Sequence, residues 1–320
     1  MAEMLLTIQH GNRVFSPPVK DDIQIEWERS GVPGKLTFTV VKMFDEDMGF
    51  GEGDVVTFRY DGKVIFAGYV FTKSRDKQHH IKVTCYDQLR YLKNKFSYVF
   101  EKKRADEIIR ALCADFEMAT GSIENTNYVI PAIAEENTTA YDIILKVLDD
   151  TLTNTGEMYI LYDDAGKITL ENAADMTSSV FISEDTAENF DYSSSIDKET
   201  YNSIVLYYKD ENNTIIPFTA MDDDKLAEWG TLRYFEEVKI PTIAQNKANQ
   251  LLRLYSRKTR ELTVKDAFGD PSVRAGCLIP VKLYLGDYQV SEYLQVAKVT
   301  HKFKEDHYTM DLTLEGAYEE

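Results

Sequence analysis

Two acidic groups carry the oxygen ligands that a hard cation such as Ca²⁺ prefers. They are Asp222-Asp-Asp224 and Asp163-Asp-Ala-Gly166. Neither has the alternating Asp-x-Asp-x-Asp-Gly spacing with a distal Glu that an EF-hand loop requires. Short acidic runs are typical of solvated turns. We therefore expect two turns and assign no metal ligand, although the sequence alone leaves an ion at Asp222–Asp224 open.

Histidines offer a second kind of metal site. His79 and His80 are consecutive, so on a strand their side chains would point to opposite faces of the sheet. His301 and His307 flank a Lys-Glu-Asp turn, and a hairpin could bring them together. Two imidazoles without a third ligand make a poor Zn²⁺ site. We expect each ring to bond a backbone group or a neighbouring strand, although an ion at His301 and His307 also stays open.

Catalytic groups give no pattern that stands out. Glu135-Glu136 or Glu236-Glu237 would serve glycan cleavage only if two carboxylates faced each other across a cleft, roughly 5–10 Å apart. In a chain with 54 acidic residues such pairs arise by chance. Phosphate-binding, dinucleotide-binding and nucleophile motifs are absent from the sequence. The sequence therefore predicts a non-enzymatic protein without catalytic residues, cofactor-binding residues, metal ligands or cofactors.

Cysteines and aromatic residues are better explained by packing. Cys85, Cys113 and Cys277 lie in apolar, periodic segments, so a Cys–His dyad is less expected than buried, inert thiols. The 20 Tyr and 16 Phe residues could stack on sugars in a lectin-like site. Their even spread along predicted strands favours packing across neighbouring strands instead. Cys85 and the nearby Asp87 are accordingly expected to be a packing residue and a turn residue.

The first hundred residues predict a β-meander. Alternating or β-branched strands are expected at 35–41, 54–60, 63–71 and 80–86. Asp61-Gly62 separates the second strand from the third, and Asp-Gly is the preferred sequence of a tight hairpin with positive φ.

The middle and the last third mix helices with strands. Helices are predicted at 105–116, at 138–150 and from about 242 to 257, because their apolar residues recur every three to four positions. A hairpin is expected at 157–171, followed by the polar stretch Ser193-Ser-Ser195. Strands are predicted at 202–208, at 215–220 and from Leu262 onward.

The two ends of the chain look like variants of one module. Gly53 begins a strand that turns at Asp61-Gly62, and Gly276 begins one that turns at Gly286-Asp287. The following strands match at 64–70 with 294–299 and at 81–86 with 308–314. The spacing from Val70 to Val83 equals that from Val299 to Leu312. The alternative is that any two β-meanders share this order.

Charge is distributed unevenly along the chain. Lys and Arg minus Asp and Glu gives +1 for residues 1–100, −15 for 101–200 and −4 for 201–320. An acidic chain repels phosphate backbones, so no nucleic-acid binding is expected. The longest apolar runs fall short of the roughly 20 residues of a membrane span, and the N-terminal run is too short for a signal peptide. We expect folding in a reducing cytoplasm and, if the protein leaves the cell, release by lysis.

Several sequence blocks resemble the XkdQ/YqbQ-type hub proteins of prophages and contractile bacteriocins. In the first hundred residues the blocks are Gly34-Lys-Leu-Thr-Phe, Gly53-Asp-Val-Val, Ile65-Phe-Ala-Gly and Val83-Thr-Cys-Tyr-Asp-Gln-Leu-Arg-Tyr-Leu92. Further on they are Tyr201-Asn-Ser-Ile, Trp229-Gly-Thr-Leu-Arg-Tyr, Val273-Arg-Ala-Gly, Val299-Thr-His-Lys-Phe and His307-Tyr-Thr-Met310. The resemblance covers nearly the whole chain. The family looks distantly related to the myophage baseplate hub, and it offers no established catalytic residues to carry over.

Together these observations predict an α+β, β-dominated fold with two similar β-barrel modules of the tube type, 1–98 and 196–320. An acidic α+β domain, 99–195, is expected between them, and the helix near 242–257 in the last module. The resemblance implies a trimeric baseplate hub with pseudo-six-fold symmetry, whose partners are the tail tube protein, the central spike protein and other baseplate proteins. The alternatives are a tail-associated cell-wall hydrolase and a carbohydrate-binding tail protein.

Overall fold

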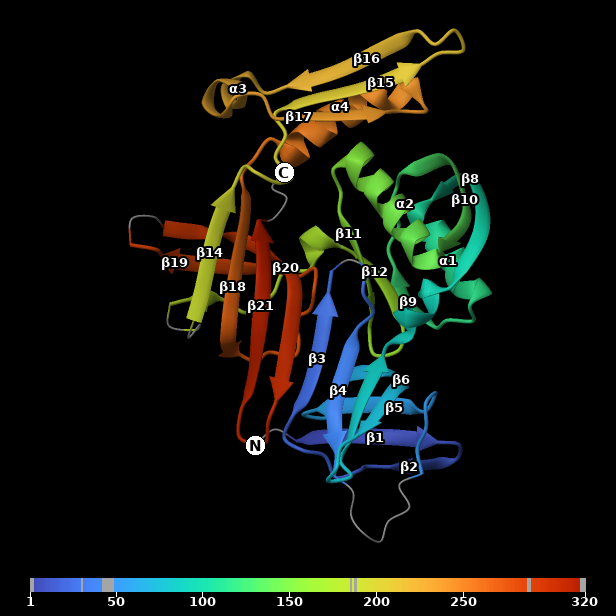
Figure 1. The fold of residues 1–320 in the computed structure, drawn as a ribbon, viewed down its shortest axis with the longest axis vertical. Coiled ribbons are helices and arrows are strands. Elements are labelled where there is room, and N and C mark those ends of the chain that lie inside the picture. Colours follow the sequence, from blue (N-terminus) through green and yellow to red (C-terminus); the bar gives the residue numbers. More distant parts are fainter. Residues whose placement is uncertain are drawn as a thin grey trace.

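The computed structural model describes residues 3–29, 31–41, 49–184, 186, 189–286 and 289–316. Strands dominate it, and its two largest groups of strands form one continuous sheet (Figure 1). The predicted β-dominated α+β fold class is confirmed.

The first group of strands, here called the first half, is antiparallel throughout. Its order across the sheet is β3-β4-β7-β6-β5-β1-β2. The bounds are β1 (Met4–His10), β2 (Arg13–Phe15), β3 (Ile23–Glu28), β4 (Lys35–Val40), β5 (Val55–Tyr60), β6 (Lys63–Arg75) and β7 (Ile81–Tyr86). Asp61 and Gly62 have φ values of 49° and 78° between β5 and β6, so the predicted Asp-Gly hairpin is confirmed.

The second half contains the last strands of the chain and two that precede them. Its strands are β13 (Ile182–Ser183), β14 (Asn189–Ser195), β18 (Thr259–Phe268), β19 (Leu278–Tyr284), β20 (Gln289–Phe303) and β21 (Tyr308–Gly316). The order is β14-β18-β21-β20, with β19 paired to β20 and β13 paired in parallel to β19. Ser193–Ser195, which we placed at the end of the acidic domain, therefore lies in a strand of this half.

The middle segment packs two helices against two small sheets. Its elements are the 3-10 helix η1 (Gln88–Lys93), β8 (Lys95–Arg104), α1 (Ala105–Asp115), β9 (Thr120–Ile123), β10 (Val129–Thr139), α2 (Ala140–Thr155), β11 (Tyr159–Asp163), β12 (Ile168–Asn172) and the 3-10 helix η2 (Ala173–Asp175). The Thr139 hydroxyl accepts a hydrogen bond from the Asp142 amide at the start of α2, and Gly156 ends this helix with a φ of 83°. Both predicted helices are present.

A separate α/β layer, residues 203–255, lies at one end of the molecule (Figure 1). It consists of β15 (Ser203–Lys209), β16 (Ile215–Met221), α3 (Asp223–Trp229), β17 (Arg233–Glu237) and α4 (Pro241–Tyr255). The sheet order is β16-β15-β17, and α4 buries Ala244, Ala248 and Leu251 in a core of its own. The expected range 196–320 thus contains two layers, because the chain leaves the second half after β14 and returns to it at β18.

The two halves have the same strand connections. The meander β5-β6-β7 continues to β4 and β3, and the meander β19-β20-β21 continues to β18 and β14. Gly53 donates its N–H to the carbonyl of Val70 and Gly276 donates to that of Val296, each over 2.8 Å. One β-bulge follows each acceptor, between Val70 and Thr72 in β6 and between Val296 and Lys298 in β20.

The register of the predicted repeat needs a correction. We matched Val70 with Val299 because each lies thirteen residues before its partner in the next strand. In the structure Val299 opposes Leu312, but Val83 opposes Lys73. Val299 therefore corresponds to Lys73, and Val70 corresponds to Val296. Equal spacing failed as a guide because the paired strands differ in length: β20 pairs with β21 for four residues beyond Val299, whereas β6 pairs with β7 for only two beyond Lys73.

Candidate functional site

The Asp222–Asp224 run begins helix α3. Asp222 Oδ1 accepts a hydrogen bond from the Lys225 amide over 3.0 Å, and its Oδ2 accepts one from the Ser256 hydroxyl over 2.6 Å. The hydrogen bond from Ser256 lowers the pKa of Asp222. Asp223 and Asp224 occupy the first helical turn, where negative charge is favourable. The run is a helix cap rather than the free turn we expected.

His301 is buried inside the second half, where protein groups contact both of its ring nitrogens. Nε2 lies 2.9 Å from the carbonyl of Val273, and Nδ1 lies 2.6 Å from the hydroxyl of Tyr308. Burial lowers the pKa of His301 to about 4. His307 lies in the exposed turn between β20 and β21. The bonds to a backbone group and a neighbouring strand are those the sequence predicted for a structural histidine.

The other histidine pair also lies in a turn. His79 has a φ of 65°, and His80 precedes β7. Contrary to our expectation, neither residue therefore lies on a strand. His80 Nδ1 lies 2.8 Å from the carboxylate of Asp76. Within the described ranges no three His, Cys, Asp or Glu side chains group closely enough to hold a metal ion.

One glutamate of each candidate acid pair forms an ion pair with a lysine, and the thiols are buried. Glu135 pairs with Lys146, and Glu236 pairs with Lys247. All three cysteines are buried, and burial raises the pKa of each thiol, to about 11 for Cys113. A raised pKa disfavours the thiolate, which is the nucleophilic form.

Sequence reasoning missed a buried charge cluster at the centre of the molecule. Asp87 caps η1 and accepts hydrogen bonds from the amides of Gly34, over 2.8 Å, and Leu89, over 3.1 Å. Burial raises the pKa of Asp87, and the charge of Asp163 raises it further. Burial also raises the pKa of Asp163. Asp163 is in the segment we identified as a turn, and its Oδ1 accepts from the Gly166 amide.

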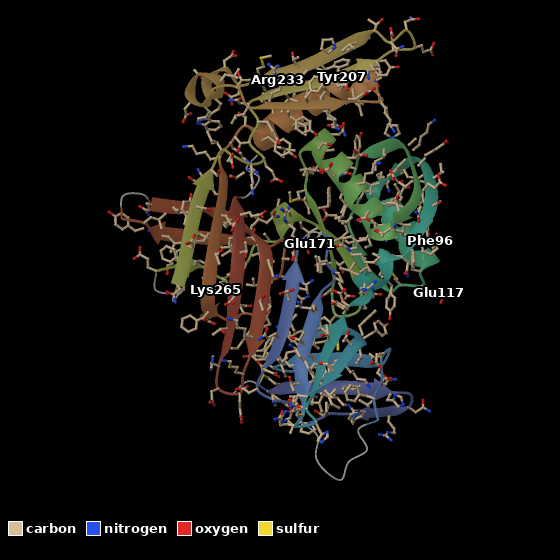
Figure 2. The ribbon with its side chains drawn as sticks, in the orientation of Figure 1. Phe96, Glu117, Glu171, Tyr207, Arg233 and Lys265 are labelled. Carbon is tan, nitrogen blue, oxygen red and sulfur yellow. The ribbon has the colours of Figure 1, made fainter. Side chains whose placement is uncertain are left out.

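Arg274 provides the positive charge of this cluster. Its guanidinium carbon lies 4.1 Å from the ring centre of Tyr162 and 5.3 Å from that of Trp27. Trp27 belongs to the first half, Tyr162 to the middle segment and Arg274 to the second half. Figure 2 shows the neighbouring Glu171, whose carboxylate accepts from the Tyr162 hydroxyl, at the same central junction. The positive charge of Arg274 acts to lower the pKa of both carboxyl groups. The cluster joins three parts of the chain, and no signal in the sequence indicated that Arg274 would lie near Asp87 and Asp163.

A polar groove of about 770 Å³ separates the α/β layer from the second half. Strands β14 and β18 form one wall, and α3 with the end of α4 forms the other. Charged residues on the walls pair with each other, as Lys225 does with Glu228 and Arg260 with Glu292. The ammonium of Lys225 lies over the ring of Trp229, at 4.6 Å from its centre.

The two halves meet in a strand pairing, here called the seam. Two other strand segments among the residues that the structure describes have a partner strand on one side only. The seam is the antiparallel pairing of β3 with the last part of β20, from Lys298↔Glu28 to Phe303↔Ile23. In the described part of the chain, β14 is the outermost strand of the second half. Residues 72–75 of β6 have β7 on one side, whereas the pairing with β5 ends at Tyr69. Within the described residues, both edges thus have a strand partner on one side only.

None of the helices in the described residues combines the length and apolar character needed to cross a membrane.

Comparisons with known proteins support an assignment to a family. The model of the YQBQ-like family matches residues 23–315. The protein XkdQ of the phage-like element PBSX of Bacillus subtilis is 35% identical over 304 residues, which cover 92% of this chain and 91% of XkdQ. The uncharacterized protein YqbQ of the same bacterium is 32% identical over 305 residues, with the same coverage. The predicted resemblance to XkdQ/YqbQ-type proteins is confirmed.

A solved structure shows a similar fold over nearly the whole chain. The 43 kDa tail protein of prophage MuSo2 from Shewanella oneidensis has a TM-score of 0.73 and 13% identity, with 97% of this chain and 98% of that chain covered. A match at this identity supports the fold and does not transfer a function. Because the family model matches the chain from β3 to β21, this chain belongs to the YQBQ-like family.

Proposed function

We propose that this protein is a non-enzymatic structural hub of a contractile phage-tail-like particle, where three copies form a ring between the tail tube and the central spike. The observation that carries the proposal is the duplication within the chain, two halves with the same strand connections joined edge to edge. The name of the MuSo2 protein supports a role in a tail structure, and that of XkdQ supports an origin in a phage-like element.

The duplication explains how a trimer could meet a six-fold tube. Two similar halves per chain give six similar halves in a ring of three copies. Such a ring would present a repeated surface to a hexameric tube and keep true three-fold symmetry for the spike. The α/β layer lies outside the continuous sheet (Figure 1), where it would be available to other baseplate proteins.

The chemistry of the side chains supports a role without catalysis. The buried carboxyl groups Asp87 and Asp163 accept backbone hydrogen bonds at a junction of three parts of the chain. The thiols are buried, and His301 is held by two protein partners. Neither a cofactor nor a metal is part of the proposal.

The proposed domain organisation keeps the order of the sequence ranges 1–98, 99–195 and 196–320 with two changes: β13 and β14 join the last β module, and the α/β layer is an insertion into it. Assembly would take place in the bacterial cytoplasm, and the particle would be released by lysis. The particle would be a phage, a defective prophage or a bacteriocin of the contractile type.

Co-assembly tests the proposal. The tagged chain is co-expressed with the tube and spike proteins of its own element, and the purified complex is viewed by electron microscopy. We expect one complex that contains all three proteins, with the chain at the tube end, and no such complex when the chain is omitted. Tube and spike proteins that join each other without the chain would contradict the proposal.

The rival functions have their own assays. A tail-associated hydrolase would clear a peptidoglycan zymogram, and a carbohydrate-binding tail protein would be retained on purified cell wall. The groove beside Trp229 is where sugar binding would be sought. The hub proposal expects neither clearing nor retention.

A further inference from the structure

Residues of the two halves can be matched one to one through their strand pairings. Each half contains a row of four residues that oppose one another across consecutive strands. The rows are Gln24, Thr37, Thr84 and Thr72 in the first half, and Asp191, Thr263, Thr313 and Lys298 in the second. Thr72 of β6 therefore corresponds to Lys298 of β20, and Gln24 of β3 corresponds to Asp191 of β14.

This correspondence relates the seam to the edge of β14 and the edge of β6 at residues 72–75. In the seam, the last part of β20 pairs with β3 of the same chain. The equivalent of that part of β20 is residues 72–75 of β6, and the equivalent of β3 is β14. Both equivalents are present in every copy, but within the described residues they do not pair with each other.

We infer that β14 of one copy pairs in antiparallel fashion with residues 72–75 of β6 in a second copy. The inference rests on the proposed trimeric hub and names the contact that would build it. The register follows from the seam. Lys298 opposes Glu28, which lies four residues after Gln24. Ser195 lies four residues after Asp191, so Thr72 of one copy opposes Ser195 of the next, and Ser74 opposes Ser193.

The composition of the β14 edge suits this contact. Ser193, Ser194 and Ser195 are exposed, as are Thr72 and Ser74. Edge strands that must avoid pairing usually carry Pro, Lys or a bulge. Strand β14 has neither Pro nor Lys and pairs with β18 without a bulge over seven residues. Residues 72–75 of β6 carry Lys73 and Arg75 and follow a bulge. The equivalent part of β20 carries Lys298 and Lys302 and also follows a bulge, and it nevertheless pairs with β3.

Head-to-tail pairing accounts for the closure of a ring. Each copy offers one β14 edge and one β6 edge, which are different surfaces, so the contact is heterologous and can repeat from copy to copy. In a closed ring of three, every copy uses both edges. The six halves would then be joined by six strand pairings, three within chains and three between them.

Disulfide trapping tests the register. In the variant Ser74→Cys/Ser193→Cys, the two thiols lie opposite each other between copies, where Cα atoms of opposed strand residues are about 5 Å apart and a disulfide can form. The native cysteines are buried, so the wild type serves as a blank. We expect oxidised protein to run as covalent dimers and trimers on a denaturing gel without reductant. Mixed single variants, Ser74→Cys with Ser193→Cys, should give dimers alone.

A slipped variant is the matched control. In Ser74→Cys/Ser194→Cys the second thiol points to the opposite face of the strand, because side chains alternate. It should give at least tenfold less cross-linked product. The variant Thr72→Cys/Ser195→Cys repeats the test two residues along the same face, should the first variant fold poorly.

The outcomes separate this inference from the proposed function. A trimer by mass that forms no disulfide in either matched variant, or equally much in the slipped variant, would overturn the pairing and leave the trimeric hub standing. A chain that stays monomeric even with tube protein would contradict the hub and the pairing together.

Discussion

His301 lies within the second half, with Trp27 edge-on at 5.1 Å between ring centres. The carbonyl of Val273 can only accept a hydrogen bond, so Nε2 carries the proton and donates to it. Nδ1 of the neutral ring then accepts from the hydroxyl of Tyr308. This arrangement fixes the tautomer of a ring that burial keeps uncharged.

Acid should therefore destabilise the protein through His301. In the unfolded chain this ring takes up a proton near its ordinary pKa of 6.5, whereas in the folded protein the pKa is about 4. Stability contributed by the neutral ring is present above pH 6.5 and is lost as the pH falls toward 4. The difference between the two pKa values corresponds to roughly 3 kcal/mol of unfolding free energy. Urea unfolding of wild type and His301→Gln from pH 4 to 7.5 measures it.

We expect the stability gap between wild type and His301→Gln to shrink as the pH falls through this window. The exposed residue His307 provides the control, since His307→Gln should follow the wild-type curve. A gap that stays constant with pH would show that the protonation of His301 is not linked to folding.

Asp163 should give a pH dependence of the opposite sign. Its pKa is raised from the ordinary value of 3.8, so the folded protein holds this proton more tightly than the unfolded chain does. The contribution of the group to stability is present below pH 3.8 and is lost as the pH rises through the folded pKa. In Asp163→Asn the loss is absent, and the charge beside Asp87 is removed.

The free energy of unfolding of Asp163→Asn, relative to wild type, should rise between pH 4 and 7. Urea unfolding at each pH checks this. The exposed neighbour Asp164 supplies the control variant Asp164→Asn, for which no such rise is expected. A relative stability that falls with pH would refute the assignment of a raised pKa.

At the scale of elements, local sequence signals predicted what local physics determines. The Asp61-Gly62 hairpin and the helices α1, α2 and α4 follow from turn chemistry and apolar periodicity. Strands β8 and β10 were missed, because Lys and Glu interrupt their alternation and their pairing joins distant residues, from Val129↔Arg104 to Thr139↔Lys95. Strand β14 was missed because its serines have low strand propensity, and its pairing with β18 is what holds it.

The equivalent glycines Gly53 and Gly276 differ in what surrounds them. Their φ values are 91° and 96°, so alanine is strained at both positions. A Cβ on Gly53 would meet nothing within 4 Å, whereas one on Gly276 would lie 2.7 Å from Cγ2 of Ile160. Gly53→Ala should cost about 1 kcal/mol, and Gly276→Ala about 1–3 kcal/mol more.

Thermal and urea unfolding of both variants measure the difference. The double variant Ile160→Ala/Gly276→Ala removes the methyl group in the way and should cost less than the two single changes added together. Equal losses in the two glycine variants would show that the contact with Ile160 relaxes without cost.

At the scale of the whole molecule, the sequence predicted two similar β modules but not how they meet. The seam joins residues 23–28 to residues 298–303, and such distant pairing leaves no periodic signal in either strand. The charge cluster of Asp87, Asp163 and Arg274 could not be predicted from the sequence for the same reason, since its members come together only in the folded chain. The α/β layer was hidden because its strands and helix looked like a continuation of the second half.

The central claim is that three copies of this chain form the ring, and its mass in solution tests it most directly. Multi-angle light scattering on the purified chain, alone and mixed with the tube protein of its own element, gives this mass. The account predicts a species of three times 36.7 kDa, about 110 kDa, in at least one of the two conditions. A chain that remains at 36.7 kDa in both conditions, and never enters a ring with tube protein, would contradict it.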